Sequence, residues 1–234
     1  MTDALHVGLM VPINNTTMER EVLAWLPAGS TCTTLRIPRG KGMLTAETLP
    51  DYKASALALA TQFADPGIDV VAYGCTAAGF ISGPAGDARL QAELGSVTGK
   101  PVVTVARSMV LALQEAGARE IALVTPYLDA VNEQLKAFLA DGGIRVRRFD
   151  SFYAKDVDEL GRIEAPAVAR LARETMDDGC DALFIACAQL PTRDILGGLE
   201  REFKRPALSS IQVTAQKALL AMRQSTDRET VSSK

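Results

Sequence analysis

The sequence predicts an α/β protein of two similar halves, each built on a parallel β-sheet, with a cleft between them. Short apolar runs alternate with helix-length segments along the chain, a pattern typical of βαβ units. The same landmarks recur at similar spacing in both halves. Cys75 and Cys187 each follow a short apolar run, one in each half. The ends of such strands are where parallel sheets hold their ligands.

Eight apolar runs bounded by turn residues are expected to be strands. In chain order they are His6–Val11, Ser30–Arg36, Val70–Tyr73, Val102–Val105, Ile121–Val124, Arg145–Phe149, Ala182–Ala186 and Ala207–Ser209. Helices are expected between them, where apolar residues recur at helical spacing, as Tyr52, Leu57, Ala60 and Phe63 do. These are Met18–Leu26, Leu49–Phe63, Ala85–Thr98, Ser108–Ala116, Val131–Ala140, Ala165–Asp177, Thr192–Glu202 and Val213–Arg223.

An internal duplication relates the two halves by a pseudo-twofold axis. Pro12 and Pro126 end matching apolar runs 114 residues apart, and the two cysteines lie 112 residues apart. Lys100-Pro-Val-Val-Thr104 is similar to Arg205-Pro-Ala-Leu-Ser209, 105 residues later. Repeats of this kind indicate duplicated structural units.

The duplication predicts where the chain divides. We expect an N-terminal half over residues 1–115, a C-terminal half over 116–223 and a polar tail over 224–234. The C-terminal helix, 213–223, is expected to be able to cross back and pack on the first half. The active cleft is expected between the two halves.

Composition and charge narrow the function classes. The 234 residues are 47% hydrophobic and 23% charged, with a net charge of -3, as in ordinary globular proteins. This charge gives no general attraction to nucleic acid or to an anionic membrane, so neither is expected as a partner. The first twelve residues lack a basic signal-peptide region, and no run approaches the roughly 18 apolar residues of a membrane span. A cytoplasmic location is expected.

The cysteine and histidine content limits the possible chemistry. The four cysteines show no Cys-x-x-Cys spacing, and His6, in the first strand, is the only histidine. A disulfide framework, a Cys/His metal site and a histidine-dependent nucleophile are therefore not expected. Cys32 and Cys180 lack matching partners at strand ends and are expected to be structural.

Cys75 and Cys187 are the candidate catalytic residues. Small residues follow Cys75, from Thr76 to Gly79, and allow close approach of the backbone to a ligand. A helix beginning there would favour a thiolate and a substrate carboxylate. A free cysteine is also often a buried packing residue. The matching position of Cys187 favours the functional interpretation.

Two loops offer neutral polar groups for a carboxylate. Pro12-Ile-Asn-Asn-Thr-Thr17 precedes a helix, where Thr17 is expected to cap and Asn15 to face the cleft. In the second half the matching loop offers Tyr127, whose hydroxyl could bind substrate or pack at the cleft edge.

These residues resemble the aspartate/glutamate racemase superfamily, and within it the maleate cis–trans isomerase and arylmalonate decarboxylase branch. The segment Val11-Pro-Ile-Asn-Asn-Thr-Thr-Met-Glu-Arg-Glu21 is similar to the isomerase pattern V-P-S-S-N-T-T-M-E-x-E. Ala72–Cys75, Ala186–Leu190 and Pro126-Tyr127 resemble further segments of that branch. The resemblance covers nearly the whole chain and implies two Rossmann-like (flavodoxin-like) halves.

The resemblance implies a cofactor-independent isomerase that acts on a small carboxylate, as a homodimer and without a metal. Cys75 would add to maleate to give a succinyl-cysteine, whose central bond rotates before fumarate leaves, with Cys187 as acid or base. The substrate-binding residues expected from it are Pro12, Asn15, Thr76, Tyr127, Ala188 and Asp158.

Two departures keep alternatives open. Where the isomerases carry a second asparagine, this chain offers Val157 and Asp158. An aspartate there would repel a second substrate carboxylate, but it could pair with an α-ammonium. The run after Cys75 is also more similar to that of racemases. An amino-acid racemase using two thiols is therefore one alternative, an arylmalonate-decarboxylase-like lyase another, and a carboxylate sensor a third.

Overall fold

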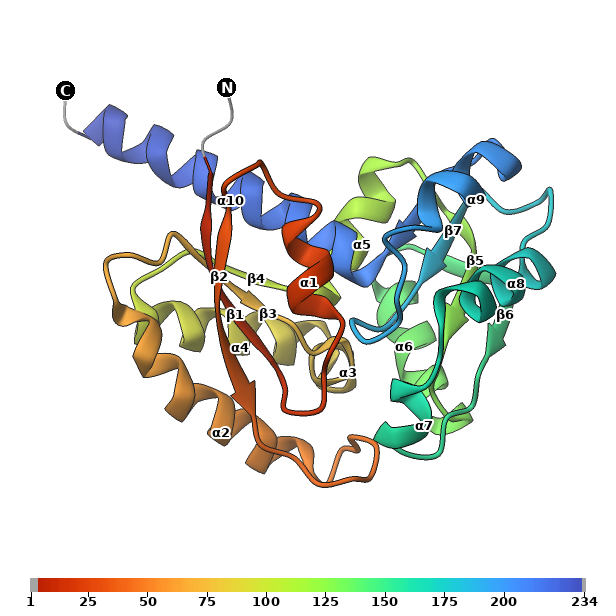
Figure 1. Ribbon diagram of the computed structural model, residues 1–234, viewed down its shortest axis with the longest axis horizontal. Coiled ribbons are helices and arrows are strands. Elements are labelled where there is room, and N and C mark those ends of the chain that lie inside the picture. The colour runs from red at the N-terminus through yellow and green to blue at the C-terminus, as the bar shows by residue number, and fades with distance from the viewer. Residues whose placement is uncertain (1–3, 233–234) are drawn as a thin grey trace.

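The chain forms two α/β halves with a sheet in each, as the computed structural model shows (Figure 1). Residues 4–232 are described, with side chains as far as residue 224. The strands of both sheets are parallel, and both follow the same order, with the second strand of the half at one edge and the fourth at the other. This shared order is the structural counterpart of the duplication in the sequence.

The N-terminal sheet has the order β2-β1-β3-β4. Its strands are β1 (His6–Pro12), β2 (Thr31–Ile37), β3 (Val70–Tyr73) and β4 (Val102–Thr104). The central strands β1 and β3 are almost continuously apolar because both of their faces are covered. The edge strand β2 instead alternates, with Thr31 and Thr33 exposed.

The C-terminal sheet has the order β6-β5-β7-β8. Its strands are β5 (Glu120–Thr125), β6 (Arg145–Ser151), β7 (Ala182–Ile185) and β8 (Ala207–Ser209). The edge strand β6 carries Arg145, Arg147 and Arg148, which pair with Glu120 and Asp177 on the surface. Charged side chains on an edge strand discourage pairing with another chain.

Helices cover both faces of each sheet. In the N-terminal half they are α1 (Met18–Leu23), α2 (Leu49–Ala60) with a 3₁₀ turn over Thr61–Ala64, α3 (Thr76–Ile81), α4 (Gly83–Thr98) and α5 (Val105–Glu115). In the C-terminal half they are α6 (Asp129–Asp141), α7 (Val157–Gly161), α8 (Ala165–Thr175), α9 (Leu196–Phe203) and α10 (Ser210–Ser232).

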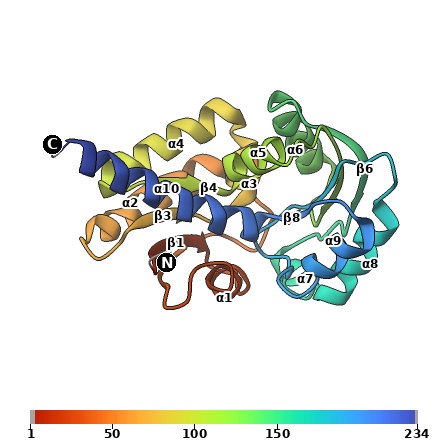
Figure 2. The ribbon, with the colours of Figure 1, turned by 90° about the horizontal axis from the view of Figure 1, so that it is seen from above.

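The halves exchange helices. The long helix α10 leaves β8 and packs on the N-terminal sheet beside α1, burying Ile211, Ala215 and Ala218 (Figure 2). In the other direction, Ala106 and Met109 of α5 belong to the core of the C-terminal half. Because each core includes a helix of the other half, the orientation of the two sheets is held by apolar packing.

Several helices differ from the sequence prediction. The short helices α3 and α7 were not among the predicted helices, and α10 runs from Ser210 to Ser232, so part of the expected polar tail is helical. Residues 233–234 lie outside the described part. The expected helix from Thr192 begins only at Leu196, because Thr192 has its N–H and hydroxyl bonded to other elements.

A buried carboxylate joins the halves next to the cleft. Glu21 of α1 is 5% exposed and accepts hydrogen bonds from the N–H groups of Thr192 and Arg193 and from the Thr192 hydroxyl, at 3.0–3.2 Å. Thr192 Oγ1 is also 2.9 Å from Ser209 Oγ at the end of β8. These contacts tie α1 to the loop that follows Cys187.

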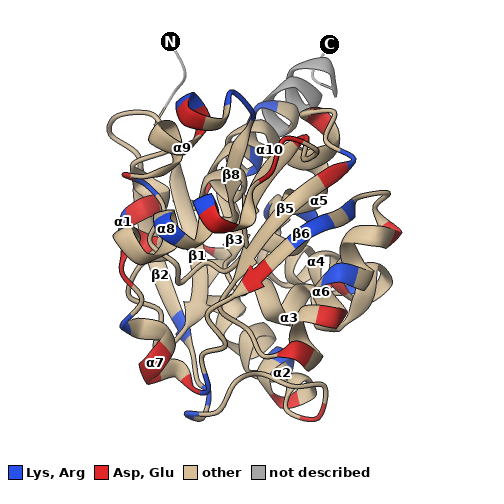
Figure 3. Ribbon diagram, turned by 90° about the vertical axis from the view of Figure 1, so that its right-hand side faces the viewer, with Lys and Arg blue, Asp and Glu red and all other residues tan. Residues whose placement is uncertain are grey.

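Surface charge is mixed on the side of the C-terminal half. Figure 3 shows acidic and basic segments interspersed over α8, β6 and α6. Within residues 4–232, no helix is both long and apolar enough to cross a membrane.

We predict that Glu21→Ala lowers the free energy of unfolding by about 3 kcal/mol, because the buried Thr192 N–H and the partly buried Arg193 N–H lose their acceptor. The matched control is Glu19→Ala, which removes a half-exposed ion pair with Arg36 and should cost less than about 1 kcal/mol. Urea denaturation of the three proteins measures both values. Equal effects of the two substitutions would contradict a bridging role for Glu21.

Candidate active site

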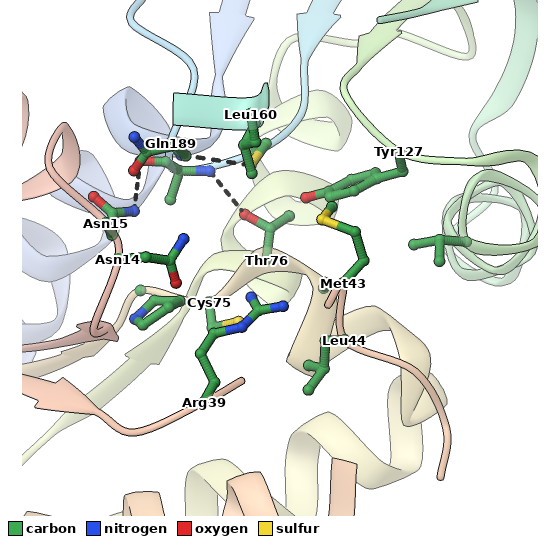
Figure 4. Close-up of a pocket in the computed structure, with 16 residues that line it drawn as sticks. Asn14, Asn15, Arg39, Met43, Leu44, Cys75, Thr76, Tyr127, Leu160 and Gln189 are labelled. Atoms are coloured by element: carbon green, nitrogen blue, oxygen red, sulfur yellow. Dashed lines mark hydrogen bonds between the residues drawn. The ribbon is translucent and has the colours of Figure 1, made fainter. Parts of the chain in front are cut away.

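Two cysteines from opposite halves line one pocket between the sheets. Cys75 follows β3 after one glycine, and Cys187 follows β7 after one alanine. Both thiols therefore lie at the carboxyl ends of central strands, and both line the same pocket (Figure 4). The structure thus brings together the two thiols that the duplication singled out.

The backbone around each cysteine is constrained. A side chain on Gly74 would lie 2.5 Å from Met18 Sδ and 2.8 Å from the Met10 carbonyl oxygen, so only glycine allows this approach to β1. Cys187 has a φ of 131°, a conformation that non-glycine residues rarely adopt. Strain of this kind is concentrated at functional sites. Both features direct a thiol into the pocket.

Cys75 sits at the N-cap of α3 and is 5% exposed. Burial raises the pKa of its thiol above the usual 9.0. The N–H groups of Ala77 and Ala78, the Tyr52 hydroxyl and the positive charge of Arg39 act in the opposite direction and lower this pKa. The site thus protects a neutral thiol from water while providing groups that stabilise its thiolate.

Burial also raises the pKa of Cys187, which is 8% exposed. The Gln189 N–H, 3.5 Å from Sγ, and the Tyr127 hydroxyl lower this pKa, whereas negative charge on Cys75 raises it. When Cys75 ionises, Cys187 is therefore held as a neutral thiol. The positive charge of Arg39 acts on Cys75, and this favours Cys75 as the nucleophile and Cys187 as the proton donor.

Hydroxyl groups connect the two thiol loops. Thr76 Oγ1 accepts a hydrogen bond from the Ala188 N–H at 3.2 Å and donates to Ser210 Oγ at 3.5 Å. Ser210 Oγ accepts from the Cys187 N–H at 3.0 Å. The buried Tyr127 hydroxyl lies beside both Cys187 and Thr76. Thr76, Tyr127 and Ala188 therefore meet at one side of the pocket, as small neutral groups suited to a carboxylate.

Asn15 lines the pocket, but it also holds the structure together. Its Oδ1 accepts from the N–H groups of Thr17 and Met18, and its Nδ2 donates to the Ala188 carbonyl at 3.0 Å. Asn15 rather than Thr17 therefore caps α1, since the Thr17 side chain makes no capping bond. A second N–H on Nδ2 is left for a ligand. Pro12 lines the pocket beside Asn15.

Asp158, which was expected to bind substrate, is exposed and does not line the pocket. Asp156 caps α7 by accepting from the N–H groups of Asp158 and Glu159. Helical spacing then turns Val157 and Leu160 inward and leaves Asp158 exposed. Leu160, rather than Asp158, lines the pocket. The expected carboxylate at this wall is replaced by an apolar surface.

The loop after β2 supplies residues that the sequence analysis missed. Arg39, Met43 and Leu44 line the pocket from this loop. The loop also reaches the other half, where the Val157 N–H donates to the Lys41 carbonyl at 3.3 Å. The place of this loop directly after a predicted strand indicates such residues, because loops that follow parallel strands meet at the same edge of the sheet. Asn14, Val131 and Gln189 are further lining residues that were not named.

Cys32 and Cys180 lie away from the pocket. Cys32 is half-buried in β2, where burial raises its pKa to about 12. Cys180 packs before β7 and donates to Asp177 at 3.3 Å. Among the described residues, no group of three or more His, Cys, Asp or Glu is arranged to hold a metal ion.

Comparison with known proteins places this fold and pocket in one family of α/β enzymes. The arylmalonate decarboxylase family profile matches residues 8–232. The chain belongs to this family.

Curated relatives carry two names. A maleate isomerase from Geobacillus stearothermophilus is 27% identical over 234 residues, covering 95% of this chain and 93% of the relative. An arylmalonate decarboxylase from Bordetella bronchiseptica is 30% identical over 174 residues, covering 73% and 72%.

Solved structures agree with this placement. A Nocardia farcinica maleate cis–trans isomerase, crystallised as a cysteine-to-serine mutant with a covalently bound succinylcysteine intermediate, superposes with a TM-score of 0.85. It is 26% identical to this chain, and the match covers 94% of each. The structure of an enzyme of this fold therefore records a covalent bond between cysteine and a four-carbon dicarboxylate.

We predict that alkylation of Cys75 by iodoacetamide keeps accelerating, about tenfold per pH unit, up to and beyond about pH 9. The reason is that burial raises the thiol pKa above 9.0 and the thiolate is the reacting form. Peptide-resolved mass spectrometry measures the rate, and the unfolded chain, whose rate levels off near the ordinary thiol pKa, is the control. A plateau in the folded protein below about pH 8 would contradict the assignment.

Proposed function

We propose that this chain is a cofactor-independent maleate cis–trans isomerase that works through a covalent succinyl-cysteine. The observation that carries the proposal is the pair of buried thiols, Cys75 and Cys187, which reach one pocket from opposite halves. Supporting it are maleate isomerase relatives matched over nearly the full chain and the succinylcysteine in the Nocardia structure. A two-thiol site can supply both a nucleophile and a proton without a cofactor.

The proposed reaction begins with the thiolate of Cys75. Its sulfur bonds to one alkene carbon of maleate, and the displaced π electrons take the proton of the Cys187 thiol at the other carbon. The central bond is then single and rotates. Cys187, now a thiolate, removes a proton from that carbon, the double bond re-forms, and the bond to Cys75 breaks. Fumarate leaves, and both cysteines return to their starting states.

The pocket supports this sequence at the substrate carboxylate on the alkene carbon that Cys75 does not attack. The second N–H of Asn15 Nδ2 donates to this group, and the hydroxyls of Thr76 and Tyr127 turn to it from Ser210 and Cys187 when substrate binds. Negative charge grows on this carboxylate as the thiolate adds. Donors held beside the place where this charge develops favour that transition state.

A decarboxylase is the second candidate, and one observation favours it. Met43, Leu44, Val131 and Leu160 form an apolar wall that an aryl or alkyl substituent could contact. The family description and the Bordetella relative point the same way. The racemase alternative has lost its specific support, because Asp158 lies outside the pocket and cannot pair there with an α-ammonium.

We also infer a homodimer, supported by exposed apolar side chains at Ile13, Leu128 and Tyr153, which follow strands at the cleft side. Light scattering that gives twice the chain mass supports this assembly. A single-chain mass at micromolar concentration contradicts it.

We predict that the protein converts maleate to fumarate, and that Cys75→Ala abolishes the conversion because no nucleophile remains. Cys187→Ser should lower kcat by about 10²- to 10⁴-fold, the range for loss of a general acid–base group. Proton NMR of maleate, phenylmalonate and aspartate in D2O measures all three candidate reactions, because racemisation removes the α-proton signal of aspartate. The matched control, Cys32→Ser, should keep full activity.

Loss of carbon dioxide from phenylmalonate with no fumarate from maleate would replace the isomerase by the decarboxylase. Full activity of both Cys75→Ala and Cys187→Ser on the true substrate would rule out the two-thiol mechanism.

A further inference from the structure

Arg39 carries a positive charge in the pocket. It follows the edge strand β2, and its side chain lies beside Cys75, with Asn14 and Met43 nearby (Figure 4). Of the described lining residues it is the only lysine or arginine, and none of them is an aspartate or glutamate. The pocket therefore has a net positive charge.

The guanidinium of Arg39 is only partly used by the protein. One terminal nitrogen donates to the Gly42 carbonyl within its own loop. Nε is buried without a hydrogen-bond partner, and in the described part of the chain no carboxylate forms an ion pair with Arg39. A buried, unpaired donor is costly. In a pocket it marks the place where a ligand supplies the acceptor.

The neutral donors account for one carboxylate only. Thr76, Tyr127 and Asn15 come from the loops after β3, β5 and β1 and are drawn in a row above Cys75 in the close-up. Arg39 comes from the loop after β2, and its guanidinium is drawn at Cys75, below that row. A dicarboxylate placed over Cys75 would thus meet neutral donors at one end and a guanidinium at the other.

We propose that Arg39 binds the second carboxylate of the substrate and thereby selects dicarboxylates over monocarboxylates. This inference rests on the proposed function, because a dicarboxylate substrate needs a group that binds its second carboxylate. A guanidinium fork suits a carboxylate, which it can bind through two N–H groups. The same charge offsets the repulsion between a dianion and the Cys75 thiolate, whose pKa it lowers.

The test compares binding of succinate with binding of its monoamide, succinamate, because neither has an alkene to react. Arg39→Met removes the charge, Arg39→Lys keeps it without the fork, and Lys41→Met removes an exposed charge two residues away as a matched control. Titration calorimetry measures affinity, and circular dichroism checks the fold of each variant.

We expect the wild type to bind succinate more tightly than succinamate. Arg39→Met should weaken the binding of succinate by about 10- to 100-fold, the range for loss of a hydrogen bond to a charged group. The same substitution should leave the binding of succinamate nearly unchanged. Arg39→Lys should fall between, and Lys41→Met should match the wild type. If Arg39→Met lost affinity for succinate and for succinamate equally, Arg39 would only anchor its loop, and the proposal would be overturned. An unchanged preference for succinate would overturn it as well.

The test separates the isomerase activity from the role of Arg39, because the binding of succinate requires no reaction. A wild type that leaves maleate unchanged but shows Arg39-dependent selectivity for succinate contradicts the isomerase and supports the carboxylate site. A wild type that isomerises maleate, with the same KM in Arg39→Met, supports the isomerase and contradicts the carboxylate site.

Discussion

The site depends on hydrogen bonds that cross from one half of the protein to the other beside the two thiols. Asn15 and Thr76 of the first half bond to the two sides of one residue, the Ala188 carbonyl and N–H, next to Cys187. Buried Glu21 holds the following loop. Since these groups are buried, separating the halves would leave several of them unpaired. The thiols are therefore held facing one pocket, although they lie 112 residues apart in sequence.

This arrangement explains why several polar groups of one half have their partners in the other. The opening loop both caps α1 and binds the Cys187 loop, so Asn15 serves structure and substrate together. Burial keeps both thiols neutral until substrate chemistry requires a charge, while Arg39 and the N–H groups at α3 favour ionisation of Cys75. The shared fold positions the reagents, and the loops after the strands decide which carboxylate they act on.

The fold was predictable where sequence pattern and burial agree. The central strand β3 is a continuous apolar run and matches its predicted bounds, and the short edge strand β8 matches its bounds as well. Helices α3 and α7 were missed because five or six residues carry little periodicity. Thiol placement was predictable from the duplication. Arg39 was missed because its loop has no local motif, and Asp158 was misplaced because the turn of α7 directs Leu160 inward instead.

The central claim is that one substrate lies between two thiols, covalently held by Cys75 and protonated by Cys187. A crystal structure of the Cys187→Ser protein soaked with maleate tests it most directly. The account predicts continuous electron density from Cys75 Sγ to a four-carbon unit, with one carboxylate at Thr76 and Tyr127 and the other at Arg39. Maleate bound without a covalent bond to Cys75, or with neither carboxylate at these residues, would contradict it.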